Sequence, residues 1–167
     1  MSRRPSIRMG ELMVIQDDGE LRTLLGSCVG IALYDHSSKV GGLAHAVLPR
    51  SPGGDDVSEG RFVDTAAEAL VRRMAELAGR PVRPTARIAG GAEMFKTSAL
   101  VSIGAQNIEA SEQVLAGMGI PIVDRHCGGK QGRRMSFDTG SGRITVEMVG
   151  QAPVELHDRK TPGRALS

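Results

Sequence analysis

A cysteine and a histidine in the first third of the chain are the residues best suited to chemistry. Cys28 follows the turn-forming pair Gly26-Ser27, and His45 stands 17 residues later (45 − 28 = 17), inside an apolar run. A cysteine nucleophile needs a base beside it, because a free thiol is mostly protonated near neutral pH. It also benefits from backbone N–H groups that face a developing oxyanion, and Gly26 permits the sharp turn that exposes them near Ser27 and Cys28. These residue types favour the hypothesis of nucleophilic hydrolysis by Cys28 with His45 as its base.

A β-hairpin is the element that would bring these two residues together, since a separation of 17 residues does not make helical neighbours. Val29–Tyr34 and Val40–Leu48 are apolar runs on either side of the turn Asp35–Lys39, and antiparallel pairing places them side by side. Both residues also have a structural explanation. A cysteine in an apolar strand is more often a small buried hydrophobe, and a histidine among leucine and alanine is more often a hydrogen-bonded core residue.

The remaining elements follow from apolar periodicity and turn residues. Strands are expected at Glu11–Gln16, Leu21–Leu25, Ala86–Ala89 and Ile120–Val123, with a hairpin over residues 133–149. Helices are expected at Phe62–Leu77, ended by Gly79, and at about Ala105–Met118. Strands outnumber helices and come in hairpins, so the predicted class is α+β, with mixed or antiparallel sheets packed against two main helices. A regular βαβ alternation is missing, which argues against a doubly wound nucleotide-binding fold.

The chain length and the loss of periodicity near both ends define the expected domain organisation. A length of 167 residues fits one domain. We expect a flexible head over residues 1–9, the folded domain over 10–150 and a mobile tail over 151–167.

Composition excludes several classes of function. A net charge of +2, a single Tyr and no Trp argue against nucleic-acid binding. The beginning of the chain holds charges and no continuous apolar segment, so neither a secretory signal nor membrane insertion is expected. We therefore expect a cytoplasmic protein in which Cys28 and Cys127 are free thiols.

An ordered set of motifs resembles the CheD family of chemoreceptor glutamine deamidases. The resemblance runs in order from about Gly10 and is strongest in TLLGSCVGIALYD and KVGGLAHAVLP, which contain Cys28 and His45. It continues in order to about Val149 through the segments Arg61–Asp64, Gly90–Phe95, Ile103–Asn107, Gly128–Arg134 and the hairpin containing Thr139-Gly140. The tripeptide Gly-Ser-Cys alone would be a weak signal, whereas the ordered set covers nearly the whole domain.

The resemblance implies a Cys-His-Thr site on a fold similar to toxin-type cysteine deamidase domains. Cys28 matches the family's nucleophile, His45 its base, and Thr23 the third member that orients the imidazole. The implied reaction hydrolyses glutamine side chains of methyl-accepting chemotaxis receptors to glutamate through a Cys thioester, without a cofactor. A CheC-type phosphatase is an implied partner. The Phe95 region and the 128–134 loop are candidate contact surfaces, and their glycines have the competing role of forming backbone turns.

Several alternatives remain at this stage. Thr23 has the competing role of a structural strand residue, because a different strand register would point it to the other face. Cys28, His45, His126 and Cys127 would make a Cys2His2 zinc set, but adjacent ligands are awkward for one tetrahedral ion and zinc-type spacings are absent, so no metal is expected. The chain could also be a non-catalytic regulator of a CheC-type phosphatase, or a cysteine hydrolase of another amide or ester, such as receptor methyl esters.

Overall fold

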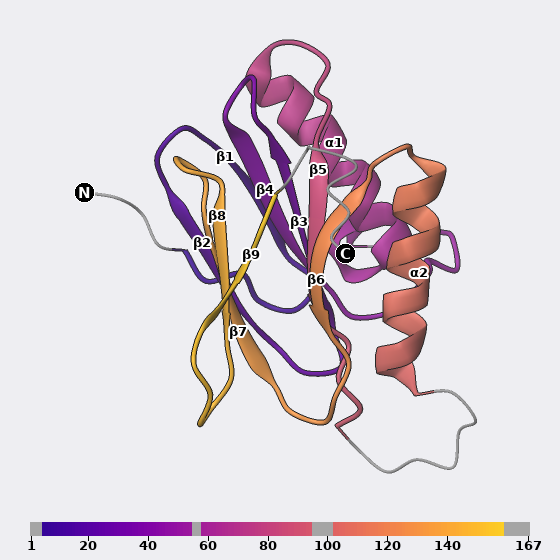
Figure 1. Ribbon diagram of the computed structural model, residues 1–167. Helices are drawn as coiled ribbons and strands as arrows, with labels where there is room; N and C mark the ends of the chain where they lie inside the picture. The colour runs from indigo at the N-terminus through magenta and orange to yellow at the C-terminus, as the bar shows by residue number, and fades with distance from the viewer. Residues whose placement is uncertain (1–4, 55–57, 95–101, 159–167) are drawn as a thin grey trace.

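Two β-sheets and two α-helices form three layers in the computed structural model, which describes residues 5–54, 58–94 and 102–158 (Figure 1). Within those residues, one sheet has the spatial order β1 (Leu12–Gln16), β4 (Val40–Ala46), β3 (Val29–Asp35), β5 (Thr85–Gly90) and β6 (Ile122–Cys127). The other has the order β2 (Glu20–Leu25), β7 (Arg133–Asp138), β8 (Arg143–Glu147) and β9 (Val154–Leu156). The predicted α+β class with two main helices is confirmed, while the likeness to toxin-type deamidase domains stays a prediction.

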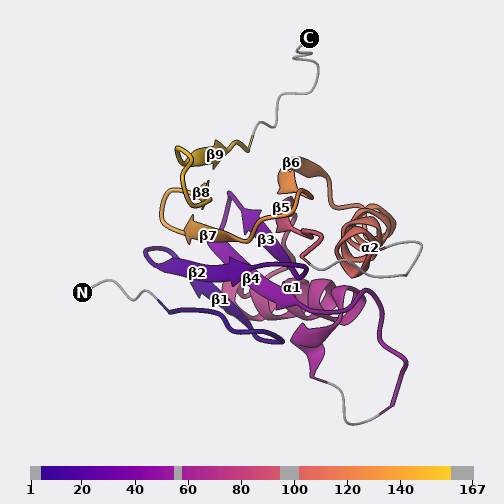
Figure 2. The same ribbon diagram turned by 90° about the horizontal axis from the view of Figure 1, so that it is seen from below.

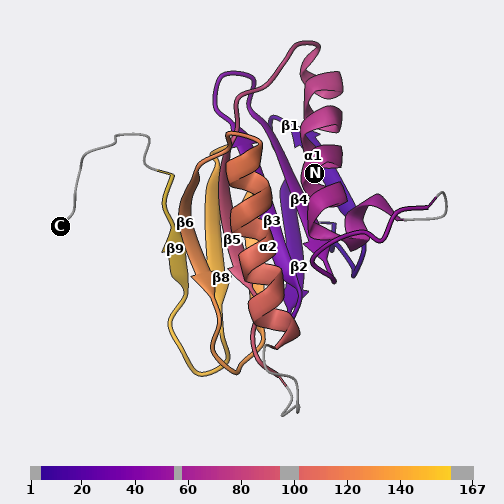
Figure 3. The same ribbon diagram turned by 90° about the vertical axis from the view of Figure 1, so that its right-hand side faces the viewer.

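Helices α1 (Val63–Ala78) and α2 (Ile103–Gly117) cover the outer face of the first sheet (Figure 3). A short 3-10 helix, η1 (Glu59–Arg61), precedes α1. The helix α1 ends where the sequence predicted, because Gly79 adopts a left-handed conformation and its N–H bonds to Ala75 O. The helix α2 begins two residues before the predicted start and is capped by the Ser102 hydroxyl, which accepts a hydrogen bond from Ala105 N.

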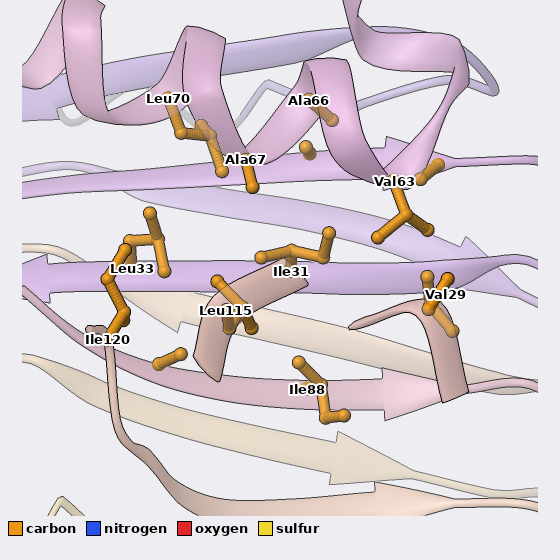
Figure 4. Packing of buried hydrophobic residues seen from close by; sticks show 14 of the residues in the cluster. Val29, Ile31, Leu33, Val63, Ala66, Ala67, Leu70, Ile88, Leu115 and Ile120 are labelled. Carbon is orange, nitrogen blue, oxygen red and sulfur yellow. The ribbon is translucent and has the colours of Figure 1, made fainter. Parts of the chain in front are cut away.

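Strand alternation in β3 divides the interior into two cores. Val29, Ile31 and Leu33 face the helices, where they pack with residues of α1 and α2 (Figure 4). Alternate positions, including Cys28, Ala32 and Tyr34, belong to the core between the two sheets. Figure 2 shows this arrangement from below, with the second sheet on one side of the first and the helices on the other. Cys28 therefore lies on the face directed toward the second sheet.

Antiparallel pairing of β3 with β4 confirms the predicted hairpin around residues 35–39. The register places Val29 opposite Ala46 and Gly30 opposite His45. The hairpin predicted over residues 133–149 is present as β7 and β8. Parallel pairing occurs between β5 and β6, which α2 connects.

Residues outside the expected domain bounds 10–150 contact the folded domain at both ends. Ser6 bridges to Arg22, and Ile7 is buried against β2, so part of the segment expected as a head packs on the domain. The predicted tail likewise contains β9, which pairs with β8. A three-residue strand is too short to produce a visible alternation, and its stability comes from the neighbouring strand's backbone groups.

The strand expected at Ile120–Val123 lies further along the chain. It begins at Ile122 and continues through His126 and Cys127, pairing with β5 as far as Gly90. Because β6 is an edge strand, its later residues are polar and half-exposed. A search for apolar runs therefore does not detect this part of the strand.

Candidate active site

Cys28 is held in a tight connection between β2 and β3 by backbone contacts with the end of β5. Gly91 N donates to Cys28 O over 2.8 Å, and Ala92 N donates to Gly26 O over 2.9 Å. Gly90 has a φ of +103°, and a Cβ added there would collide with the carbonyl oxygen of Cys28. Glycine at position 90 is thus required both by its backbone conformation and by the close approach of the cysteine loop.

His45 lies on β4 on the same side of the sheet as Cys28. It stands opposite Gly30, two residues beyond Cys28, and successive side chains on a strand alternate between faces. The side chains of both residues are buried, with 7% of Cys28 and 4% of His45 exposed. Between these two described residues there is no hydrogen bond, so the sulfur and the imidazole lie on one face of the sheet without being paired.

Thr23 is the third residue that the sequence predicted, and the structure brings it to His45. Its Oγ1 lies 2.7 Å from His45 Nδ1 and 2.6 Å from the carbonyl oxygen of Ile7. Strand β2 points Leu21, Thr23 and Leu25 into the core between the sheets, so the register that would have turned Thr23 away is not the one formed. Geometrically, the hydroxyl links the histidine to the backbone of the amino-terminal segment.

The contacts of Thr23 determine which nitrogen of His45 carries a proton. A carbonyl oxygen can only accept, so the single hydroxyl proton of Thr23 is donated to Ile7 O. The hydroxyl oxygen must then accept from His45, which places the imidazole proton on Nδ1. This leaves Nε2 with a lone pair, and that atom is buried with no hydrogen-bond partner among the described residues. A buried imidazole nitrogen with a free lone pair is a base available to a neighbouring acid.

Burial sets the protonation of both reactive groups. It raises the pKa of the Cys28 thiol above its ordinary value of 9.0, and the backbone N–H of Cys28 opposes the effect in part. Burial also lowers the pKa of His45 from its ordinary value of 6.5, against a smaller contribution of the opposite sign from the Ile7 carbonyl. Both shifts favour the neutral thiol and neutral imidazole over an ion pair in the resting state.

Gly26 and Ser27 were predicted to give backbone support to an oxyanion, and the hydrogen bonds that the structure shows for them involve their carbonyl oxygens. Gly26 O and Ser27 O are both engaged, the first by Ala92 N and the second by the side-chain amide of Asn107. The N–H of Cys28 has no backbone hydrogen-bond partner among the described residues, and it lies beside its own sulfur, where it lowers the pKa of the thiol. An N–H in this position has the chemistry of an oxyanion donor.

Sequence reasoning missed two contributors to this site. The Ile7 carbonyl fixes the Thr23 proton, but a backbone atom in a presumed flexible head leaves no sequence signal. Asn107 lies in the Ile103–Asn107 motif, which was recognised as a family feature and not as part of the site. Its place in the second turn of α2, five residues after the capping Ser102 (107 − 102 = 5), was the available signal.

His126 and Cys127 are placed apart from this constellation. His126 Nδ1 lies 3.0 Å from an Arg133 guanidinium nitrogen, and the Cys127 thiol donates to Ile88 O over 3.7 Å. In residues 5–54, 58–94 and 102–158, no group of three or more His, Cys, Asp or Glu side chains is arranged to hold a metal ion. Neither Cys28 nor Cys127 forms a disulfide.

Near Gly26, the segment that leads to Phe95 contacts the 128–134 loop, and both were suggested as contact surfaces for a CheC-type phosphatase. Met94 is next to Gly26 and partly exposed, and Glu93 N donates to Gly129 O over 2.8 Å in the 128–134 loop. Phe95, the other suggested contact, lies outside the described residues. Among the helices that the structure describes, none is long and apolar enough to cross a membrane.

Comparisons with known proteins match this chain over most of its length. A family model described as CheD, chemotactic sensory transduction, matches residues 47–148. A probable chemoreceptor glutamine deamidase CheD from Methanococcus maripaludis is 39% identical over 141 residues, covering 84% of this chain and 92% of that protein. A protein of the same description from Caldanaerobacter subterraneus is 40% identical over 149 residues, covering 86% and 92%. The chemoreceptor glutamine deamidase CheD of Bacillus licheniformis is 38% identical over 153 residues, covering 87% and 91%.

Proposed function

The chain belongs to the CheD family, and from this membership and the geometry beside Cys28 we propose that it is a cytoplasmic protein-glutamine deamidase of chemotaxis receptors. The observation that carries the proposal is the hydrogen-bond chain from His45 Nδ1 through Thr23 to Ile7 O, which leaves Nε2 free on the face shared with Cys28. A purely structural histidine would satisfy both nitrogens, because an unpaired buried polar atom costs about 1–3 kcal/mol.

The first half of the reaction forms a thioester. His45 Nε2 takes the Cys28 proton as the sulfur attacks the carboxamide carbon of a receptor glutamine, and the carbonyl oxygen becomes an oxyanion facing the Cys28 N–H. The protonated imidazole then gives its proton to the departing nitrogen, which leaves as ammonia. The product of this half is a γ-glutamyl thioester on Cys28.

The second half releases glutamate and restores the enzyme. His45 Nε2 accepts a proton from water as the water oxygen attacks the thioester carbon, and the proton is returned to the leaving sulfur. The net change is amide plus water to carboxylic acid plus ammonia. Burial disfavours the ion pair, so proton transfer accompanies attack rather than preceding it.

A receptor segment would approach at the end of the molecule where Gly26 meets Met94. Met94, next to Gly26, and Leu24, near the end of β2, are 42% and 64% exposed, and large exposed apolar side chains favour docking of another protein. The same surface supports a CheC-type phosphatase as a competing partner, which would exclude the receptor while it is bound.

Mass spectrometry on a cytoplasmic receptor fragment tests the proposal. The full-length protein should raise the mass of the fragment by about 1 Da at each converted glutamine, because an amide becomes a carboxyl group. Cys28→Ala should abolish this conversion, and Cys127→Ala, the matched change at the other cysteine, should preserve it. Full conversion by Cys28→Ala would refute the role of Cys28. If the wild type binds the receptor fragment but converts no glutamine, the protein would instead be a non-catalytic regulatory module.

A further inference from the structure

Asn107 connects the residue that follows strand β4, which carries the base, to the loop that carries the nucleophile. We propose that Asn107 is a positioning residue for the deamidation, which orients the Ser27–Cys28 peptide unit so that its N–H faces the oxyanion. This inference rests on the proposed function and assigns a task to a residue outside the Cys-His-Thr set.

One side-chain amide holds both halves of the site. Asn107 Nδ2 donates to Ser27 O and to Val47 O, each over 3.0 Å, and the residue is fully buried. Ser27 directly precedes the nucleophile, and Val47 follows His45 by two residues. Because both donors come from the same planar group, the separation between the cysteine loop and the end of β4 is fixed by a rigid unit.

The hydrogen bond to Ser27 O also sets the direction of the Cys28 N–H. The two groups belong to one planar peptide unit, and the described chain contains no cis peptide bond. In a trans unit the carbonyl and the N–H point in opposite directions. Since Ser27 O points toward Asn107 on α2, the Cys28 N–H points away from α2, and there it has no backbone partner among the described residues. Donation to the carbonyl also polarises the peptide unit and makes its N–H a stronger donor.

Gly104 at the start of α2 and Gly91 after β5 allow the helix to come close enough for this contact. A Cβ at Gly104 would lie 2.5 Å from the carbonyl oxygens of both Gly91 and Ala92. Gly91 itself has a φ of +67° and donates its N–H to Cys28 O. The helix is therefore seated directly on the backbone that supports the cysteine, and Asn107 follows Gly104 on the same helical face.

The unused end of the Asn107 amide argues against a role in packing alone. Its Oδ1 is buried and has no partner among the described residues. Reversing the amide would not help, because Oδ1 would then face two carbonyl oxygens that can only accept. An apolar residue of similar size would avoid the cost of the unpaired oxygen but would leave Ser27 O and Val47 O without donors. The pattern fits a position at which the two N–H groups are the required feature.

Three variants, made in a Cys127→Ala background, test the proposal. Asn107→Leu keeps a similar volume without any hydrogen-bond donor. Asn107→Ala also removes the donor and shows whether an effect of leucine comes from poor packing of the larger side chain. Ser111→Ala is the matched control, because this fully buried serine lies one turn later on α2 and donates only to Asn107 O. Three reactions of Cys28 are measured. They are receptor deamidation, described by kcat and KM, acylation by p-nitrophenyl acetate, and alkylation by iodoacetamide, which forms no oxyanion.

The expected pattern separates oxyanion support from thiol reactivity. Both Asn107 variants should lose about 10- to 100-fold in kcat and in acylation rate, with KM and the alkylation rate close to wild type. Ser111→Ala should match the wild type in all three rates. Unchanged kcat and acylation in folded Asn107→Leu would overturn the proposal, and so would a parallel loss of alkylation, which would place the effect on the thiol. If the wild type fails to deamidate receptors while Asn107 still controls acylation, the proposed function fails and the positioning role stands.

Discussion

Two groups of buried polar side chains lie between the sheets, and they differ in charge: one is neutral and the other contains an ion pair. Beside Cys28, His45 and Thr23 form a chain of neutral groups that ends in an unpaired nitrogen. Beside Phe137, Arg87 is 2% exposed and keeps a charge, with Nη1 donating to Leu156 O over 3.1 Å and Nη2 lying 3.7 Å from Asp158. Asp158 also accepts from Thr85 over 2.9 Å and lies 2.5 Å from His36 Nε2.

Pairing of charge distinguishes the two clusters. Burial lowers the pKa of Arg87, and Asp158 is the largest opposing influence, so the guanidinium remains charged beside its carboxylate. For Cys28 and His45 the largest influence is also burial, and the opposing contributions come from backbone groups rather than from a charge. A buried cluster with paired charges resists chemical change, whereas a neutral acid beside a free base can exchange a proton with a substrate. We expect the first to govern stability and the second to govern rate.

Replacement of His45 should produce the largest effect. His45→Ala removes the only proposed general base, and such groups contribute about 10²–10⁴-fold to a rate. Deamidation of a receptor fragment, followed by mass spectrometry, should therefore fall by that factor, while the thermal unfolding midpoint changes little. Retention of the wild-type rate would remove His45 from the mechanism and with it the contrast between the clusters.

Replacement of Arg87 should give the opposite pattern. Arg87→Met keeps an apolar side chain beside Phe137 and leaves the buried Asp158 without its guanidinium, which should destabilise the fold by about 3 kcal/mol. Denaturant unfolding measures this loss, and kcat at a temperature where the variant is folded should match the wild type. A loss of kcat comparable to that of His45→Ala would show that the two clusters are not independent.

The two clusters were unequally visible in the sequence. His45 lies in one apolar strand and Cys28 directly precedes another, and the turn and spacing between these strands predict a hairpin, so the common face of the two residues follows from local pattern. Arg87 falls in the predicted short strand Ala86–Ala89, but its ion-pair partner Asp158 lies in a segment with no periodicity. The sequence therefore does not predict this ion pair. Ile7 and Asn107 were missed for a related reason. Their contacts join segments remote in sequence through backbone carbonyls, which any residue type supplies.

Removal of the Thr23 hydroxyl should have a smaller effect than loss of the base. Thr23→Val keeps the shape of the side chain but leaves His45 Nδ1 and Ile7 O unpaired, so the proton is no longer confined to Nδ1. We expect kcat to fall by about 10-fold, because a misplaced tautomer blocks Nε2 in part of the molecules. Thr139→Val is the matched control, since this buried hydroxyl also donates to backbone carbonyls, of Asp17 and Gly19, at another turn. Equal losses in the two variants would mean that the hydroxyls act only through stability.

The pH profile of deamidation provides the finest test of the contrast. Burial lowers the pKa of His45 from 6.5, so the folded enzyme should keep its imidazole neutral below that pH. As pH falls, kcat/KM should therefore decline with a midpoint below 6.5, and at pH 6.5 more than half of the plateau value should remain. Arg87→Met should leave this midpoint in place, because the Arg87 charge is not among the influences on His45. A midpoint above 6.5 would require a stabilised imidazolium, and the site would then depend on paired charge in the same way as the Arg87 cluster.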